Sequence, residues 1–249
     1  MAAHRQAAAA DTRPIDALVA DAGLLPAPRP FRDTLARGRA LIAEIKRRSP
    51  SKGDLAPDLV AGVVAKAYEA GGASCLSVLT DAAFFGALPA DLSDARAAVD
   101  LPVLRKDFTV SERDVCDARI MGADAVLLIV AALSDDELSR FGAVARRLGL
   151  AAIVEVHTEP ELGRALAAGA DLIGVNQRDL TTFAVDEHLA ARLREQMPDG
   201  VVTVAESGIR DGHDVARLFA AGYDAVLVGE SLVTAPDPTA AVRQMRGAS

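Results

Sequence analysis

The feature that most constrains the fold of this chain is a unit that repeats along most of its length. In each unit a short apolar run of strand character is followed by a loop and an amphipathic helix, which often ends at glycine just before the next run. Five of these helix ends are alike and read EAGGAS, IMGADA, RLGLAA, AAGADL and AAGYDA. Glycine lets a helix stop and the chain turn back toward a sheet. The repeated unit is therefore a strand followed by a crossover helix.

Eight apolar runs carry this pattern: LIAEIK from 41, CLSVLT from 75, VLRKDF from 103, AVLLIV from 125, AIVEV from 152, LIGVNQ from 172, VVTVAES from 201 and AVLVGE from 225. Successive runs begin 20 residues (152 to 172) to 34 residues (41 to 75) apart, the length of a strand plus a crossover helix. Runs with little alternation indicate strands covered on both faces. The pattern therefore predicts an α/β protein with a closed (β/α)8 TIM barrel. An open doubly wound sheet is the alternative, although no GxGxxG follows the first run.

The domain organisation follows from the same pattern. No change of composition marks a second domain, so we expect one catalytic barrel domain over residues 31–249. Residues 1–30 are rich in alanine and proline, with one amphipathic piece around Ile15 to Leu24. We expect them to form a loosely packed extension with one helix, and we expect a second short helix from Phe31 to Arg37.

The composition of the chain limits its partners. Its 35 acidic and 27 basic residues give a net charge of -8, which disfavours general attraction to nucleic acid or to an anionic membrane. No apolar run approaches the roughly 18 residues of a membrane span, and we find no export signal. We expect a cytoplasmic protein that acts on a small molecule, as a monomer or weak homo-oligomer. Cys75 and Cys116 are expected to be buried core residues rather than a disulfide or a metal site.

Charged residues recur at the carboxyl ends of the runs, where a barrel of this kind has its active site. In the first run, Glu44 and Lys46 project to the same face because side chains alternate along a strand. Other runs end in Lys106, Asp107 and Phe108, in Glu155, in Asn176 and Arg178, and in Glu206 and Ser207. Lysines and glutamates that converge on one mouth shift each other's pKa values, which separates acid from base at neutral pH. The pattern predicts acid and base chemistry.

The histidines and cysteines form no cluster with the spacing of metal ligands, so we expect no metal site. His157 lies just beyond Glu155 and is expected to be structural or peripheral. His4, His188 and His213 are expected to be exposed loop or helix residues.

The last two runs carry a different signal. AESGI from 205 and VGES from 228 place Ser207, Gly208, Gly229 and Glu230 in loops where bare backbone N–H groups face outward. Two such loops, after the seventh and eighth strands, are typical of a phosphate site in barrels of this kind. A carboxylate near a phosphate is repulsive, so at Glu230 we expect the backbone N–H to bind and the side chain to turn away.

Seven motifs together resemble the indole-3-glycerol-phosphate synthase family of tryptophan biosynthesis. They are AEIKRRSPSKGDL from 43, PVLRKDF from 102, DAVLLIVAAL from 124, VEVHTEPEL from 154, IGVNQRDL from 173, AESGI from 205 and AVLVGESL from 225. They run in family order across residues 30 to 240. The resemblance implies a lyase that closes 1-(2-carboxyphenylamino)-1-deoxyribulose 5-phosphate onto its own aromatic ring with loss of carbon dioxide and water, without a cofactor.

The resemblance also implies roles for the charged residues. Lys106 is the general acid at ring closure, and Glu155 either stabilises the cationic intermediate or moves the proton at dehydration. Lys46 lies beside the phosphate and acts as acid in the dehydration, with Glu44 as its partner or base; the sequence does not settle how the two lysines divide the work. Asn176 and Glu206 hold the sugar hydroxyls and orient the lysines.

The remaining site residues also come from the resemblance. Arg178 reaches toward the anthranilate carboxylate, and Ser49, Pro50 and Phe108 border the aromatic ring. Leu127, Ile129 and Leu180 form an apolar wall, and the phosphate is bound by Lys46, Ser207, Gly208, Gly229 and Glu230. The family usually begins with a longer helix that packs across the mouth, a pattern that residues 1–30 match poorly.

Two other functions stay open on the sequence. A phosphoribosyl isomerase barrel would share the two glycine loops but would not be expected to combine Glu44, Lys46, Lys106 and Glu155. A barrel that has kept the fold as a ligand-binding subunit without turnover is the other alternative, although every charged residue that the reaction needs is present.

Overall fold

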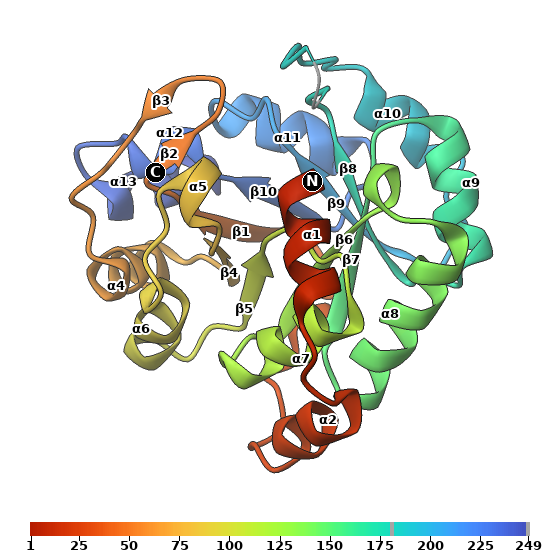
Figure 1. The fold of residues 1–249 in the computed structure, drawn as a ribbon. Coiled ribbons are helices and arrows are strands. Elements are labelled where there is room, and N and C mark those ends of the chain that lie inside the picture. The colour runs from red at the N-terminus through yellow and green to blue at the C-terminus, as the bar shows by residue number, and fades with distance from the viewer. Residues whose placement is uncertain (180–181, 248–249) are drawn as a thin grey trace.

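Eight parallel strands close into a barrel in the computed structural model, which describes residues 1–179 and 182–247 (Figure 1). Around the barrel the order is β1-β10-β9-β8-β7-β6-β5-β4, and β4 pairs with β1. The strands are β1 (Ala40–Ile45), β4 (Cys75–Leu79), β5 (Val103–Lys106), β6 (Ala125–Ile129), β7 (Ala151–Val156), β8 (Leu172–Asn176), β9 (Val202–Glu206) and β10 (Ala225–Val228). Each predicted run overlaps one of them, so the predicted barrel is confirmed and the open sheet is wrong.

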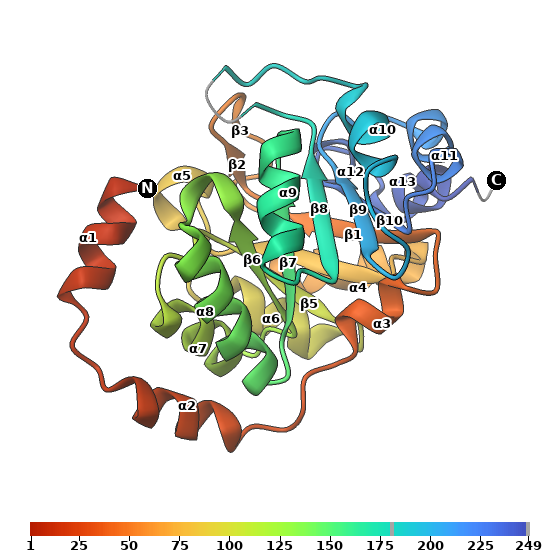
Figure 2. The same ribbon diagram turned by 90° about the vertical axis from the view of Figure 1, so that its right-hand side faces the viewer.

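Helices on the outside of the barrel connect one strand to the next (Figures 1 and 2). They are α4 (Ala61–Gly71), α6 (Asp91–Ala98), α7 (Glu112–Ile120), α8 (Asp135–Arg147), α9 (Glu159–Ala167), α10 (Leu189–Arg194) and α11 (Gly212–Ala220), with α13 (Pro238–Met245) after the last strand. Shorter elements follow β4, β6 and β10, namely α5 (Ala82–Phe85), the 3-10 helix η1 (Val130–Ala132) and α12 (Glu230–Val233). The five predicted helix-ending glycines have φ between +73° and +95°, which confirms their left-handed turns: Gly72, Gly122, Gly149, Gly169 and Gly222.

The core has two layers, one inside the barrel and one between the sheet and the helices. Inside, one cluster includes four fully buried side chains: Ile42, Leu104, Ile153 and Val204. The helix α3 (Phe31–Leu35) joins this cluster through Phe31 and Leu35, which close the end of the barrel away from the carboxyl ends of the strands. Cys75 and Cys116 are buried and free, as expected.

The chain before the barrel contains two helices, so the prediction of one helix there is wrong. They are α1 (Ala2–Ala10) and α2 (Ile15–Gly23), separated by a short segment that contains Pro14. Most of α1 is alanine, the residue type with the highest helix propensity. A search for apolar periodicity alone overlooks such a helix. Leu18, Val19 and Ala22 of α2 are buried, and α2 packs against α7. Figure 2 shows α1 continuing along the outside of the barrel toward the rim near α5.

A two-stranded antiparallel hairpin follows β1, formed by β2 (Arg48–Ser49) and β3 (Gly53–Asp54). It contains Ser49 and Pro50, which the family resemblance places at the border of the aromatic ring. In the described part of the chain no helix is both long and apolar enough to cross a lipid bilayer.

Candidate active site

A cavity of about 490 Å³ opens at the carboxyl ends of the barrel strands. The structure brings together around it every described residue that the sequence assigned to the site, whereas Leu180 lies outside the described residues. They are Glu44, Lys46, Ser49, Pro50, Lys106, Phe108, Leu127, Ile129, Glu155, Asn176, Arg178, Glu206, Ser207, Gly208, Gly229 and Glu230. Their common location is observed, and their individual roles stay predictions.

Four charged side chains form one layer across the top of the barrel interior. Glu44, Lys106, Glu155 and Glu206 come from the first, third, fifth and seventh barrel strands, counting from β1. Each lies two residues after one of the buried core residues Ile42, Leu104, Ile153 and Val204, so it points to the same face one layer higher. Alternate strands of such a barrel normally supply four packed side chains to a layer. Here that layer is charged instead of apolar.

Lys106 is the centre of this layer. Its Nζ donates to Glu155 Oε2 at 2.8 Å and to Glu206 Oε2 at 2.5 Å. The other oxygen of Glu155 accepts from Asn176 Nδ2 at 3.3 Å. Glu206 Oε1 is buried and has no hydrogen-bond partner. One ammonium group therefore lies between two carboxylates, and one carboxylate oxygen remains available to a ligand.

The pKa values of Lys106, Glu155 and Glu206 move apart because each group is buried beside a different set of charges. Burial alone would lower the pKa of Lys106, but the charges of Glu155 and Glu206 outweigh burial and raise it. Burial would raise the pKa of Glu155, but Lys106 and His157 hold it below its ordinary value. Burial and the neighbouring Glu155 raise the pKa of Glu206 to about 7, against the opposing effect of Lys106. The site therefore holds a charged lysine, an ionised carboxylate and a carboxyl group that exchanges its proton near neutral pH.

A second lysine lies at the edge of the same cavity. Lys46 Nζ donates to Glu44 Oε1 at 2.6 Å, which confirms that the two side chains share one face. Gly229 of the last loop approaches this pair so closely that a Cβ atom there would overlap Glu44 Oε1. Gly174 makes the same kind of room for Glu206 Oε1. These two glycines allow the carboxylates to occupy the layer.

The loops after β9 and β10 form one end of the cavity. Ser207 has φ of +65°, a left-handed conformation that is costly for a residue other than glycine, and Gln177 Nε2 donates to its carbonyl oxygen at 2.8 Å. The side chain of Glu230 pairs with Lys52 of the β2–β3 turn, Nζ to Oε1 at 2.5 Å. Ser231 Oγ, which the sequence analysis missed, also lines this end and donates to the carbonyl of Ile209.

The rest of the cavity wall is largely apolar. Besides the predicted Pro50, Phe108, Leu127 and Ile129, the wall includes five residues that sequence reasoning missed: Leu79, Phe85, Phe183, Val185 and Leu227. Leu79 is the last residue of β4 and Leu227 the last but one of β10, and nothing in the sequence separates a wall residue from a core residue there. Phe183 and Val185 lie in the loop after β8, which folds back over the cavity. In that loop Arg178 forms an antiparallel β-bridge with Val185, and its side chain donates to the carbonyl oxygen of Phe183.

His157 is buried beside the site, so it is not peripheral, whereas the alternative expectation of a structural role stays a prediction. Its side chain is 11% exposed, and its Nε2 lies 3.4 Å from Glu155 Oε1. On the other side its Nδ1 lies 3.2 Å from Glu161 Oε2, and its backbone N–H donates to the same oxygen at 2.8 Å. Burial would lower the pKa of His157, but Glu155 and Glu161 outweigh burial and raise it to about 9. At neutral pH the ring is therefore a second cation beside Glu155.

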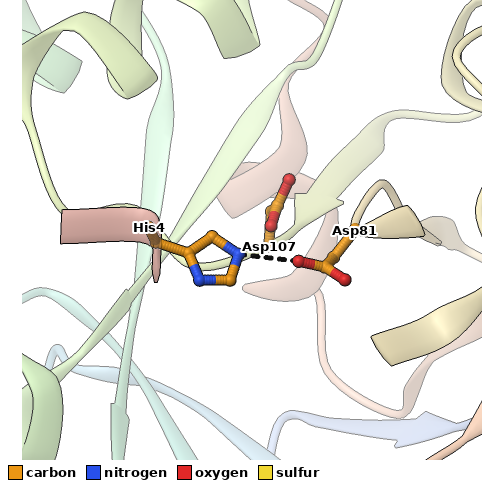
Figure 3. A group of neighbouring side chains, drawn as sticks. All are labelled: His4, Asp81 and Asp107. Carbon is orange, nitrogen blue, oxygen red and sulfur yellow. Dashed lines mark hydrogen bonds and ion pairs between the residues drawn. The ribbon is translucent and has the colours of Figure 1, made fainter. Parts of the chain in front are cut away.

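His4 is also not exposed as expected, because α1 inserts it at the rim of the mouth. Its Nε2 lies 2.7 Å from Asp81 Oδ2 (Figure 3). Its ring centroid lies 4.9 Å from that of Phe108. Among the described residues, His4, Asp81 and Asp107 form the one group of side chains with metal-ligand character. The carboxylate of Asp107, however, is already held by Arg105 at 2.8 Å and by Thr80. We therefore interpret the group as the contact that docks α1 beside Phe108. His188 and His213 are exposed, as expected.

Comparison with known proteins adds independent information. The family model for indole-3-glycerol phosphate synthase matches residues 2–245. A protein of Nocardioides sp. called indole-3-glycerol phosphate synthase is 56% identical over 212 residues, which cover 85% of this chain and 82% of that protein. Indole-3-glycerol phosphate synthase 2 of Streptomyces coelicolor is 51% identical over 227 residues, which cover 91% of this chain and 88% of that protein.

Solved structures with much lower identity share the architecture. A thiamine phosphate pyrophosphorylase from Pyrococcus furiosus matches with a TM-score of 0.63 at 18% identity, over 87% of this chain and 96% of that one. An N-acetylmannosamine-6-phosphate 2-epimerase from Clostridium perfringens matches with a TM-score of 0.64 at 14% identity, over 82% of this chain and 90% of that one. These two likenesses concern the fold alone. The family model and the close relatives go further, and the chain belongs to the indole-3-glycerol phosphate synthase family of enzymes.

Proposed function

We propose that the protein is a carboxy-lyase that converts 1-(2-carboxyphenylamino)-1-deoxyribulose 5-phosphate to indole-3-glycerol phosphate. The observation that carries the proposal is the position of Lys106, which is held between the buried Glu155 and Glu206 at the floor of a cavity with glycine loops at one end and apolar walls. The reaction needs a proton at the ketone oxygen as the aromatic carbon attacks. It then needs loss of the carboxylate as carbon dioxide, and finally loss of a hydroxyl group and a ring proton.

Lys106 fits the first step. Because its pKa is raised, it is protonated at neutral pH and can donate a strong hydrogen bond to the ketone oxygen as negative charge develops there. Glu155 and Glu206 fix the direction of the ammonium group, so little reorganisation is needed when the substrate reacts. The ionised Glu155 lies where it can stabilise the cation that forms on the aromatic amine after ring closure.

Lys46 and Glu44 fit the dehydration. They form a second acid and base pair at the cavity edge, separate from Lys106, and can act on a different oxygen of the sugar chain. Glu206, with its pKa near neutrality and one free oxygen, can hold a sugar hydroxyl and exchange a proton during the same step. Two lysines that act in sequence avoid the need for one residue to be recharged between steps.

The two ends of the cavity suit the two ends of the substrate. At the phosphate end we place the backbone N–H groups of Ser207, Gly208, Gly229 and Glu230, with Lys46 nearby. At the other end Pro50, Phe108, Leu127 and Ile129 offer an apolar wall to the aromatic ring. Arg178 lines the same cavity and supplies a guanidinium group for the ring carboxylate.

The test uses the fluorescence of the indole product, which is readable against a chain with no tryptophan. We expect the wild type to produce the signal and Lys106→Met to lower kcat between about 100- and 10,000-fold, because the general acid is removed. The matched control is Lys66→Met, which removes an exposed lysine of α4 and should keep full activity. Full turnover by Lys106→Met would remove Lys106 from its role. No signal from the wild type at high enzyme concentration would favour a non-catalytic ligand-binding barrel.

The wider setting follows from the same proposal. We propose that the enzyme works in the cytoplasm on a small phosphorylated substrate, without a cofactor, and as a monomer or weak homo-oligomer. Residues 31–249 then form the catalytic domain, and residues 1–30 form an extension that docks at its rim.

A further inference from the structure

A row of titratable groups leads from Lys106 away from the cavity. It runs from Lys106 to Glu155, from Glu155 to His157 and from His157 to Glu161. The exposed fractions of the last three side chains are 2%, 11% and 17%, so the row leads from the barrel interior toward the surface. The acid and base steps described above use Lys106 and Glu155 but give no work to His157 or Glu161.

The proposed reaction consumes a proton in each turnover, which such a row of groups could deliver. The substrate carries its ring carboxylate as an anion, and that group leaves as neutral carbon dioxide. The leaving hydroxyl departs as water, and the phosphate keeps its charge. The products therefore carry one negative charge less than the substrate, so each turnover consumes one proton from solvent. Lys106, which has donated to the ketone oxygen, must be protonated again before the next substrate reacts.

We propose that His157 and Glu161 form the path by which this proton returns from solvent to Lys106 through Glu155. The proposal rests on the function proposed above. Since His157 acts through Glu155 and does not touch the cavity contents, it is a positioning residue that also passes the proton.

The geometry of Glu155 supports this path, because its two oxygens face different partners. Oε2 accepts from Lys106 Nζ at 2.8 Å, and Oε1 faces His157 Nε2 at 3.4 Å. These two atoms are not hydrogen-bonded in the structure, so the ring first turns to point its Nε2–H at Oε1. His157 then gives this proton to Oε1, and a rotation of the carboxyl group about its Cγ–Cδ bond presents the proton to the neutral Nζ. Glu155 is then a carboxylate again, Lys106 is an ammonium group, and His157 is neutral. A water molecule at the surface restores the proton of His157 beside Glu161.

The overall direction of transfer, from His157 to Lys106, agrees with the proton affinities of these two groups, and the lowered pKa of Glu155 makes its protonated form a short-lived intermediate between them. Glu161 on α9 and Glu155 on β7 are the charged groups that face the His157 ring, and together they raise its pKa to about 9. The pKa of Lys106 is also raised, so transfer from His157 to neutral Lys106 runs downhill. At neutral pH solvent protonates the His157 ring again, because the pH lies below the pKa of that ring.

The experiment compares the first turnover with steady-state turnover in His157→Gln. Glutamine keeps an N–H donor near the position of Nε2 but does not titrate, so it preserves the contact to Glu155 and removes the relay. Lys106 is already protonated before the first turnover. We therefore expect a wild-type rate in single turnover with excess enzyme, and a steady-state kcat lowered by at least about tenfold. Added imidazole should restore kcat in proportion to its concentration.

Two further variants sharpen the result. Glu161→Gln should lower steady-state kcat in the same way, and its pH profile should fall at lower pH than that of the wild type because His157 loses a carboxylate partner. The matched control is His213→Gln, which changes an exposed histidine on α11 and should behave as wild type.

The outcomes separate the two proposals. An inactive wild type would overturn the proposed function. An active wild type with unchanged steady-state kcat in His157→Gln would overturn the relay alone and show that Lys106 is protonated directly through the open mouth. Equal losses in single and steady-state turnover, without rescue by imidazole, would reduce His157 to a structural support and also overturn the relay.

Discussion

At the residue scale, the site depends on small residues that leave space for charged ones. Glu44 and Glu206 fit into the barrel layer because Gly229 and Gly174 have no side chain. Neither position requires the left-handed backbone, since the φ of Gly229 is -118°. Glycine is therefore needed at these positions for the space that it leaves and not for its backbone freedom. At Gly229 this space brings the loop after β10 into close contact with Glu44 of β1.

Gly229→Ala tests this requirement. Its Cβ would overlap Glu44 Oε1 and lie 3.2 Å from Lys46 Nζ, so the pair must move. We expect kcat to fall by about 10- to 100-fold, because a small misplacement of acid and base is enough to lose orientation. Circular dichroism should show an intact fold.

The control for Gly229→Ala is Gly163→Ala in α9, where an added Cβ meets no atom within 4 Å. That change should leave kcat unaltered and stabilise the helix by about 0.5–1 kcal/mol. An undiminished kcat in Gly229→Ala would show that Glu44 and Lys46 are not held by close contact with this loop.

At the scale of elements, the β2–β3 hairpin and the loop after β10 meet across the phosphate end of the cavity. Lys52 in the hairpin turn and Glu230 at the start of α12 are 178 positions apart in the sequence, and they form one ion pair. Exposed ion pairs contribute little to stability, so we infer that this one matters through charge. It neutralises a carboxylate beside the place proposed for the phosphate.

Lys52→Ala should therefore weaken substrate binding more than chemistry. We expect KM to rise by about tenfold, since an unpaired Glu230 would repel the phosphate at a cost of roughly 1.4 kcal/mol, while kcat changes little. Lys52→Ala combined with Glu230→Gln should recover most of the lost affinity.

The matched control lies on the same hairpin, where Arg48 pairs with Asp54 at 2.7 Å. Arg48→Ala should leave KM unchanged because neither Arg48 nor Asp54 lines the cavity. Equal effects of Lys52→Ala and Arg48→Ala would attribute the result to the hairpin as a whole.

At the scale of the whole molecule, the charged layer makes the stability of the fold depend on pH. Glu206 has a folded-state pKa of about 7, above the ordinary value of 4.5. The folded state therefore binds a proton that the unfolded chain has released, and the stabilisation is complete below about pH 4.5 and is lost as the pH rises to about 7.

Glu206→Gln removes this dependence. Between pH 5 and pH 7, we expect the free energy of unfolding of the wild type to fall relative to that of the variant by on the order of 2 kcal/mol. Chemical denaturation of both proteins at the two pH values measures the difference. Parallel curves for the two proteins would mean that Glu206 is ionised throughout this range. Activity of the variant should be low at both pH values.

The barrel and the charged residues of the site could be predicted because their signals are local, whereas the apolar wall of the cavity was expected only from the family resemblance. Alternation along a strand puts Glu44 and Lys46 on one face, and the glycine after each helix marks the return to the sheet. His4 and His157 could not be placed, because their positions depend on partners that only the fold supplies. His4 reaches Asp81 across 77 positions, and a histidine after a strand reads the same whether or not a carboxylate lies beside it.

The charged layer has a consequence for how such a protein can change. Below it, Ile42, Leu104, Ile153 and Val204 form a complete apolar layer, and Phe31 and Leu35 seal the far end. Those residues belong to the buried core, and none of them lines the cavity. Evolution could therefore replace the charged layer and its loops, and so change the chemistry of the site, while the apolar core beneath stays the same.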